Sequence, residues 1–296
     1  MKDNFLDKSF LKLIILGDPH LPGRLLDQKA EVIDWVNSQS DVDLVVVLGD
    51  VCATYGTKDE FEFASNFLGR IKHPLTVIAG NHDNYYSDEG FVLASKQVRL
   101  QKLENFKKAF NNSELFFAKD FDIVKMIFLA MDKVDCPLYA SISDEQIQWL
   151  KFELSKESEK PVIVFCHSPL WSEQITKNFP EAVNFMVQPE NKFAEIIANS
   201  PQVKLWVSGH VHFAMIPQLL EHPVNLYNNR VLNLLNVDMN GYSVLDESLQ
   251  AVFHDTIWTR TLYLSSDGFS TCIYNHKLKR YETHLEKSQN YISSLK

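Results

Sequence analysis

The spacing of apolar residues along the chain predicts an alternation of buried strands and amphipathic helices. Short, continuous apolar runs are typical of strands that are buried on both faces, in the middle of a layered sheet. Such runs lie at residues 11–16, 44–48, 75–79, 124–131, 162–166 and 204–208. Each run therefore predicts a strand.

The segments between these runs show helical spacing. Residues 25–37 and 58–71 each place apolar side chains on one face, which gives each helix a stripe to bury. A third helix is predicted after Ser143, where Gln146 three residues later completes the pattern of a capping box. A fourth is expected around residues 193–198. Strands that alternate with helices through short connections indicate the α/β fold class, in which ligands usually bind at the carboxyl ends of strands.

The last part of the chain has a different pattern. At about residues 256–285, polar and apolar residues alternate on both sides of a turn at Asp267 and Gly268. This pattern predicts an antiparallel hairpin plus a further strand. This hairpin either extends the second sheet or covers an edge. We expect a single domain over residues 1–296, with a core at about 10–240 and this C-terminal β extension.

The composition is that of an ordinary soluble globular protein, and it limits the partners. The 296 residues are 45% hydrophobic, which is enough to bury a large core. The formal net charge of −9 disfavours nucleic acid and anionic lipid as partners, because surfaces that bind them cluster Lys and Arg. The apolar run near the start is too short to span a membrane. We expect no membrane association, and the oligomeric state is left open.

The cysteines point to a reducing compartment. The four of them, Cys52, Cys136, Cys166 and Cys272, are far apart and form no C-x-x-C pair. Reduced thiols in the cytoplasm are the simplest interpretation.

Five of the predicted strands end in residues of the kinds that bind metal ions. The motifs GDPH, GD, GNHD, HSP and GHVH follow the first, second, third, fifth and sixth strands, and they contain half of the ten histidines. Carboxylate and imidazole groups together favour Mn, Fe, Zn or Co over Ca and Mg, which prefer oxygen-only shells. A carboxylate shared by two ions holds them about 3.5 to 4 Å apart, the spacing used in phosphoryl displacement. Asp50 is the natural bridge.

In their order along the chain, these motifs resemble the calcineurin-like metallophosphoesterase superfamily. The matching residues are Asp18 and His20 in D-x-H, Gly49 and Asp50 in G-D, residues 80–83 in G-N-H-D, a lone His167, and residues 209–212 in G-H-x-H. The likeness covers roughly residues 11–215. It implies a four-layer αββα metallophosphoesterase sandwich, to which the C-terminal β-hairpin is an extension. It also implies an enzyme, a metal-dependent phosphoric ester hydrolase.

The resemblance further implies two divalent or trivalent metal ions. One ion would be held by Asp18, His20, Asp50 and His212, and the other by Asp50, Asn81, His167 and His210. Attack of a metal-bound hydroxide on phosphorus, with no covalent intermediate, is the mechanism that such a centre implies.

Two residues of the third motif are expected to take part in catalysis. In the family pattern His82 is not a ligand but faces the scissile phosphate, where it protonates the leaving oxygen or stabilises transition-state charge. Asp83 either orients the His82 ring by accepting its other N–H or caps the loop.

Further segments suggest a substrate class. The stretches SDEQIQWL, VKMIFLAMD and HSPL are similar to the branch that contains bacterial cyclic-nucleotide phosphodiesterases and purple acid phosphatases. The loop GDVCATYG lacks the later Asp and Arg of the phosphoprotein phosphatases. We therefore expect a small-molecule phosphodiester, such as a cyclic nucleotide, as the substrate. The alternatives are a phosphomonoesterase, a DNA or RNA nuclease, which the acidic charge disfavours, and a non-catalytic scaffold on the same fold, which the retention of His82 disfavours.

Two stretches directly after metal motifs could shape the substrate pocket. Residues 88–112 are expected to form a Lys-rich helix whose polar face is solvated, with a pocket wall as the alternative. Residues 168–190 contain Trp171, Phe179 and Phe185, which either stack on a base or pack against the sheet.

Overall fold

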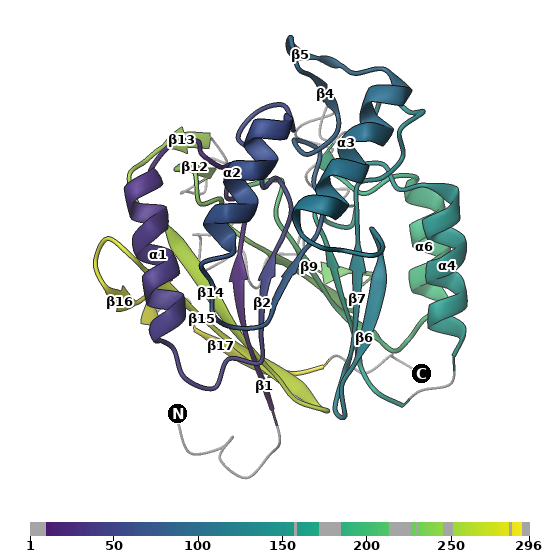
Figure 1. The fold of residues 1–296 in the computed structure, drawn as a ribbon. Coiled ribbons are helices and arrows are strands. Elements are labelled where there is room, and N and C mark those ends of the chain that lie inside the picture. The colour runs from purple at the N-terminus through teal and green to yellow at the C-terminus, as the bar shows by residue number, and fades with distance from the viewer. Residues whose placement is uncertain are drawn as a thin grey trace.

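Two mixed sheets stack face to face in this protein, and helices cover both outer sides (Figure 1). The structure is a computed structural model, and it describes residues 10–156, 159–171, 185–212, 226–228, 230–244, 251–283 and 286–291. The apolar runs of the sequence supply the central strands of both sheets.

The first sheet is built around the N-terminal strand. In spatial order its strands are β16 (Arg280–Tyr281), β15 (Gly268–Asn275), β14 (Trp258–Leu264), β1 (Leu11–Leu16), β2 (Leu44–Val47) and β3 (Leu75–Val77), and β17 (Lys287–Asn290) also pairs with β15. The strands β1, β2 and β3 are parallel, whereas β14 runs antiparallel to β1. The predicted C-terminal hairpin is therefore β14 and β15, and it extends the first sheet beside β1 and not the second sheet.

The second sheet has a parallel centre and antiparallel edges. In spatial order its strands are β10 (Leu226–Tyr227), β11 (Val231–Leu235), β9 (Val203–Ser208), β8 (Val162–Cys166), β7 (Lys125–Leu129) and β6 (Phe117–Asp120). The strands β11, β9, β8 and β7 are parallel, so their carboxyl ends lie at one edge. The sequence pattern predicted β7, β8 and β9, but not β11.

The remaining elements are helices and two small hairpins. The helices are α1 (Leu26–Ser38), α2 (Lys58–Leu68), α3 (Lys96–Ala109), α4 (Asp144–Ser155) and α6 (Glu190–Ala198). The hairpins are β4 (Tyr86–Ser87) with β5 (Gly90–Leu93), and β12 (Tyr242–Val244) with β13 (Ala251–Phe253). Among the described helices, none is both long and apolar enough to cross a membrane.

Three hydrophobic clusters separate the layers. The alternation of side chains along β1 shows this, because Ile14 packs with α1 and α2 whereas Ile15 packs between the two sheets. A third cluster, which includes Ile127, lies between the second sheet and the helices α4 and α6. Figure 1 shows α1, α2 and α3 on one side and α4 and α6 on the other. The order helix, sheet, sheet, helix confirms the predicted α/β class.

Two local predictions were wrong. Ser143 does cap α4 by accepting from the Gln146 backbone N–H at 3.1 Å, but the Gln146 side chain pairs instead with the backbone of Ala130 at the end of β7. Gln146 is buried, so its amide satisfies a buried backbone group there. Residues 88–112 are also not helical throughout, because the β4–β5 hairpin precedes α3.

Candidate metal centre

The carboxyl ends of strands from both sheets bring the predicted ligands together. Asp18 follows β1, and Asp50 follows β2. His167 follows β8 directly, and His210 and His212 follow β9. Ligand atoms of Asp18, His20 and His212 lie within 4.8 Å of one another, and so do those of Asp50, His167 and His210. Ligand atoms of His20, Asp50 and His82 also lie within 4.8 Å of one another, so a third group overlaps the first at His20 and the second at Asp50. Side chains from distant parts of the sequence thus form two groups that adjoin through His20 and Asp50.

Asp50 lies between the two groups. Its Oδ2 atom is 3.2 Å from Nε2 of His167 and 4.0 Å from Nε2 of His20. Oδ1 of Asn81 lies 3.0 Å from the same Nε2 of His167. Each of the seven residues predicted as ligands therefore lies at this edge of the two sheets, with Asp50 in the central position expected of a bridge.

The backbone at these positions is strained. Ten described non-glycine residues have a positive φ, and five of them are predicted ligands: Asp18 (41°), His20 (43°), Asp50 (48°), His210 (64°) and His212 (53°). The left-handed region is uncommon for such residues, and each costs of order 1 kcal/mol or more. Strain of this kind clusters at functional sites, where the surrounding structure imposes it.

The glycines of the motifs leave room for the carboxylates. A Cβ atom on Gly209 would lie 1.9 Å from Oδ2 of Asp18, and one on Gly80 would lie 2.3 Å from Oδ1 of Asp50. Both contacts are shorter than any real Cβ contact. The glycines of G-H-x-H and G-N-H-D therefore allow the backbone to pass directly beside the ligands.

The hydrogen bonds of His167 fix which nitrogen faces the site. Its Nδ1 atom lies 2.7 Å from the carbonyl oxygen of Leu48, which can only accept, so Nδ1 carries the proton. Nε2 then presents a lone pair toward oxygens of Asn81 and Asp50, at 3.0 and 3.2 Å. Three acceptors at these distances repel one another unless a positive charge lies among them. A cation among them, either a metal ion or a second proton on the ring, removes this repulsion.

The electrostatics of the buried groups fit a cationic occupant. Oδ2 of Asp18 and Nε2 of His210 are buried and have no hydrogen-bond partner among the described residues. Burial raises the pKa of Asp18 to about 7 and lowers the pKa of His20 to about 3. Burial alone would lower the pKa of His167, but the carboxylate of Asp50 raises it to about 9. His20 is thus neutral, the state in which an imidazole binds a metal ion, whereas His167 would have to give up a proton to bind one.

His82 is held by a backbone carbonyl and not by Asp83. Its Nδ1 atom lies 2.9 Å from the oxygen of Thr54, and its backbone N–H donates to Oδ1 of Asp50 at 2.8 Å. The buried carboxylate of Asp83 accepts the backbone N–H groups of Cys52 and Gly80 at 3.0 and 2.7 Å. Of the two roles expected for Asp83, the described contacts therefore match the loop cap.

The loop that carries Thr54 is fixed by the start of α2. Glu60 accepts the backbone N–H groups of Thr54, Tyr55 and Thr57 at 2.7, 3.1 and 3.0 Å, and Thr57 caps the helix in return. Thr57 and Glu60 thus form a full capping box, which the sequence pattern predicted at Ser143 instead. The carbonyl that orients His82 is thus set by a helix cap.

A further strand end, after β11, was missed from the sequence. Asp238 lies there with Oδ2 at 3.4 Å from Nδ1 of His212, and it accepts the backbone N–H of Tyr242 at 2.9 Å. The backbone N–H of Met239 donates to the oxygen of Gly17, next to Asp18, at 3.0 Å. The segment 236–240 therefore supports both the first and the last metal motif. Its sequence signal is weaker than that of the other strands, because Asn233 interrupts the apolar run that precedes Asp238.

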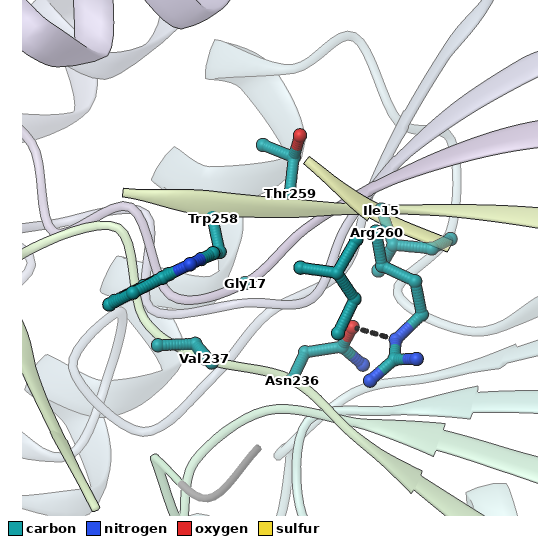
Figure 2. A pocket seen from close by; sticks show the side chains of 8 residues that line it. Ile15, Gly17, Asn236, Val237, Trp258, Thr259 and Arg260 are labelled. Atoms are coloured by element: carbon teal, nitrogen blue, oxygen red, sulfur yellow. Dashed lines mark hydrogen bonds between the residues drawn. The ribbon is translucent and has the colours of Figure 1, made fainter. Parts of the chain in front are cut away.

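Buried cations hold this segment in place. Figure 2 shows the guanidinium of Arg260 directed at Asn236, and Nε of Arg260 donates to Oδ1 of Asn236 at 2.9 Å. Both residues line a small cavity of about 10 Å³. Nζ of Lys29 donates to Oδ1 of Asn240 at 3.0 Å and to the oxygen of His20 at 3.1 Å. Burial lowers the pKa of Arg260 to about 10. These cations tie the segment to β14 and to the loop after β1.

Aromatic rings surround the two groups of ligands. Phe185 and Tyr139 lie against His210, with ring centroids 5.4 and 5.6 Å apart. Of the aromatic residues predicted in 168–190, Phe179 lies outside the described residues. Tyr242 lies 5.5 Å from the ring of His212, and Tyr86 lies 5.0 Å from the ring of His82.

Comparison with known proteins agrees with this geometry. The chain is 28% identical over 171 residues to a probable cyclic nucleotide phosphodiesterase of Fibrobacter succinogenes, covering 55% of this chain and 59% of that protein. It is 27% identical over 176 residues to a probable glycerophosphodiester phosphodiesterase, GpdQ, of Arcobacter nitrofigilis, covering 60% of this chain and 59% of that protein. The matched segments thus span less than two thirds of either relative.

A solved structure shows the same fold. The purple acid phosphatase PPD1 from yellow lupin seeds has a TM-score of 0.61 at 13% identity, over 92% of this chain and 52% of that chain. The profile of the calcineurin-like phosphoesterase family matches residues 11–214, which contain every predicted ligand. The chain therefore belongs to the calcineurin-like phosphoesterase family, as its motifs predicted.

Proposed function

We propose that this protein is a dinuclear metal-dependent phosphodiesterase that hydrolyses small phosphodiesters. The observation that carries the proposal is the position of Asp50 between two adjoining groups of ligand atoms, one with Asp18, His20 and His212 and one with His167 and His210. A shared carboxylate is how a protein holds two ions at the spacing used for phosphoryl displacement.

The proposed ligand sets follow the motifs. One ion is assigned to Asp18, His20, Asp50 and His212, and the other to Asp50, Asn81, His167 and His210. When bound, a pair of Mn, Fe, Zn or Co ions polarises the phosphoryl oxygens and lowers the pKa of the attacking water. The neutral amide of Asn81 adds an oxygen ligand without adding negative charge, which leaves the centre attractive to an anionic phosphate.

His82 is the proposed proton donor to the leaving oxygen. Because Thr54 accepts from Nδ1, the Nε2 atom is the one left to meet the substrate. A positively charged ring in this orientation donates the Nε2 proton as the phosphorus–oxygen bond breaks. Asp83 holds the loop through Cys52 and Gly80, so its proposed role is to position His82 rather than to react.

Small phosphodiesters are the proposed substrate class. The names of the relatives from Fibrobacter succinogenes and Arcobacter nitrofigilis, a cyclic nucleotide and a glycerophosphodiester phosphodiesterase, support a diester over a monoester. The net charge of −9 supports a small molecule over a nucleic acid. The four cysteines are free thiols, which supports a cytoplasmic location.

The test is a comparison of substrates with the Mn-loaded protein. We expect hydrolysis of bis(p-nitrophenyl) phosphate, and a cyclic nucleotide, a glycerophosphodiester and p-nitrophenyl phosphate assayed beside it identify the preferred class. His82→Ala should lose most turnover and keep both ions, whereas Asp50→Ala should lose turnover and metal together. Phe152→Ala, which removes an exposed ring from α4 on the outer face, is the matched control. A preference for the monoester would overturn the diester assignment, and wild-type rates in both site variants would overturn the roles.

A further inference from the structure

Three aromatic rings form a continuous group beside the proposed proton donor. The ring of Tyr86 lies 5.0 Å from His82, Phe91 lies 5.2 Å from Tyr86, and Tyr55 lies 5.1 Å from Phe91. Phe91 itself is 6.4 Å from His82. We call Tyr55, Tyr86 and Phe91 the aromatic wall.

The outer end of the aromatic wall is open to solvent. Phe91 lies on β5, and its side chain is 64% exposed. The β4–β5 hairpin projects beyond α3 in Figure 1. Single exposed rings are common on protein surfaces, and Phe152 on α4 is one, at 63% exposure. Phe91 differs because it is the end of a group of rings that begins at a predicted catalytic residue.

A buried lysine holds the aromatic wall in a fixed arrangement. Nζ of Lys102, from α3, donates to the backbone oxygens of Tyr55 and Tyr86 at 2.5 and 2.6 Å, and it pairs with Asp88 at 2.5 Å. The side chain of Lys102 is only 4% exposed. One ammonium therefore joins the loop of Tyr55 to the hairpin of Tyr86. Rings that are held in place before binding lose little entropy when a ligand stacks on them.

The base of the hairpin is fixed in the same way. The guanidinium of Arg99 donates to the backbone oxygens of Lys133 and Cys136 at 2.9 Å each, and it lies 4.9 Å from the ring of Tyr85. Arg99 is 2% exposed. Both ends of the segment that carries Tyr86 are thus anchored by buried cations of α3.

We propose that the aromatic wall is the subsite for a leaving group that carries a planar ring, such as a nucleoside, which carries a base, or a phenol. The inference rests on the proposed function, because it takes His82 as the donor to the leaving oxygen. The leaving group must then emerge on the His82 side, where the wall begins. The buried ammonium of Lys102, which holds the backbone of the aromatic wall, is paired with Asp88. The aromatic wall therefore offers a stacking surface and no free charge. This chemistry selects a neutral ring over a second phosphate.

The catalytic test compares two diesters that differ in the leaving group. For the Mn-loaded protein, kcat/KM is measured on bis(p-nitrophenyl) phosphate, which has a ring, and on glycerophosphoethanolamine, which has none. We expect Phe91→Ala to lower the ratio of the two values by about 5- to 30-fold, from the usual strength of ring stacking. Phe91→Tyr should keep the ratio, and Phe152→Ala is the control for loss of an exposed ring.

A binding test separates this inference from the proposed function. Calorimetry with adenosine 5′-monophosphate and ribose 5-phosphate measures the contribution of the ring without any turnover. We expect the wild type to bind the nucleotide about 5- to 30-fold more tightly, and Phe91→Ala to remove the difference. Equal affinities in the wild type, or a preference that survives in folded Phe91→Ala protein, would overturn the subsite. An inactive protein that still shows the preference would overturn only the proposed hydrolysis.

Discussion

Adding one methyl group at Gly209 should dismantle the metal centre while leaving the fold intact. The new Cβ atom of Gly209→Ala would lie 1.9 Å from Oδ2 of Asp18, where real contacts stay beyond 3.0 Å. The carboxylate therefore has to move by about 1 Å, whereas metal–ligand distances tolerate about 0.2 Å. Oδ1 of Asp18 also accepts the backbone N–H of His210 at 2.8 Å. The displacement consequently disturbs a ligand in each of the two groups.

The expected size of the effect separates function from stability. Loss of the hydrogen bond between Asp18 and His210 costs about 1 kcal/mol, a fall in Tm of about 2 to 4 °C. Displacement of a ligand is expected to lower metal affinity and kcat/KM by about 100-fold. Metal content by mass spectrometry, turnover of bis(p-nitrophenyl) phosphate and a thermal melt measure the three quantities. A folded Gly209→Ala protein with two ions bound and wild-type turnover would refute the reasoning.

The remaining predictions concern the groups that support the centre. Asp238→Asn should weaken metal binding at the His212 group by about 10- to 100-fold, which a metal titration checks; unchanged affinity would rule out the supporting role. Glu60→Gln should lower kcat with little change in metal content, because it removes the carboxylate that holds the loop of Thr54 beside His82. A loss of metal would contradict this expectation. Burial raises the pKa of Glu153, but the ion pairs with Lys125 and Lys156, at 2.5 Å each, together outweigh burial and bring the pKa below 4.5. The contribution of ionised Glu153 to the free energy of unfolding is thus present above pH 4.5 and is lost as the pH falls further. The fall in Tm on acidification should therefore be smaller in Glu153→Gln than in the wild type.

The convergence of the seven proposed ligands could be predicted because it depends on simple geometry. Parallel strands end at one edge of a sheet, so polar residues placed directly after apolar runs meet there whatever the details of packing. Asp18, Asp50 and His167 each follow such a run. The pattern also specified the α/β class, since side chains that alternate along a strand must fill a layer on each face.

The supporting residues could not be predicted, because they depend on long-range contacts. The strand β11 was missed since Asn233 interrupts its apolar run, and only the structure shows this amide buried and accepting the backbone N–H of Leu170 at 3.0 Å. Asp238, which follows that strand, was missed with it. The orientation of His82 was missed for a related reason: its partner is a backbone oxygen, that of Thr54, and a carbonyl leaves no mark in the sequence.

The strain in the centre and the rigidity around it are two aspects of one arrangement. Left-handed backbone at Asp18, Asp50 and His210, and acceptors that face one another around Nε2 of His167 with at most a proton between them, both raise the energy of the site. Neither would persist on a loop that could relax. The loops here cannot relax, because buried side chains such as Lys29 and Arg260 tie them to helices and strands. The core thus holds the predicted ligands in a geometry that a bound cation would stabilise, because the cation would offset the repulsion that the core imposes.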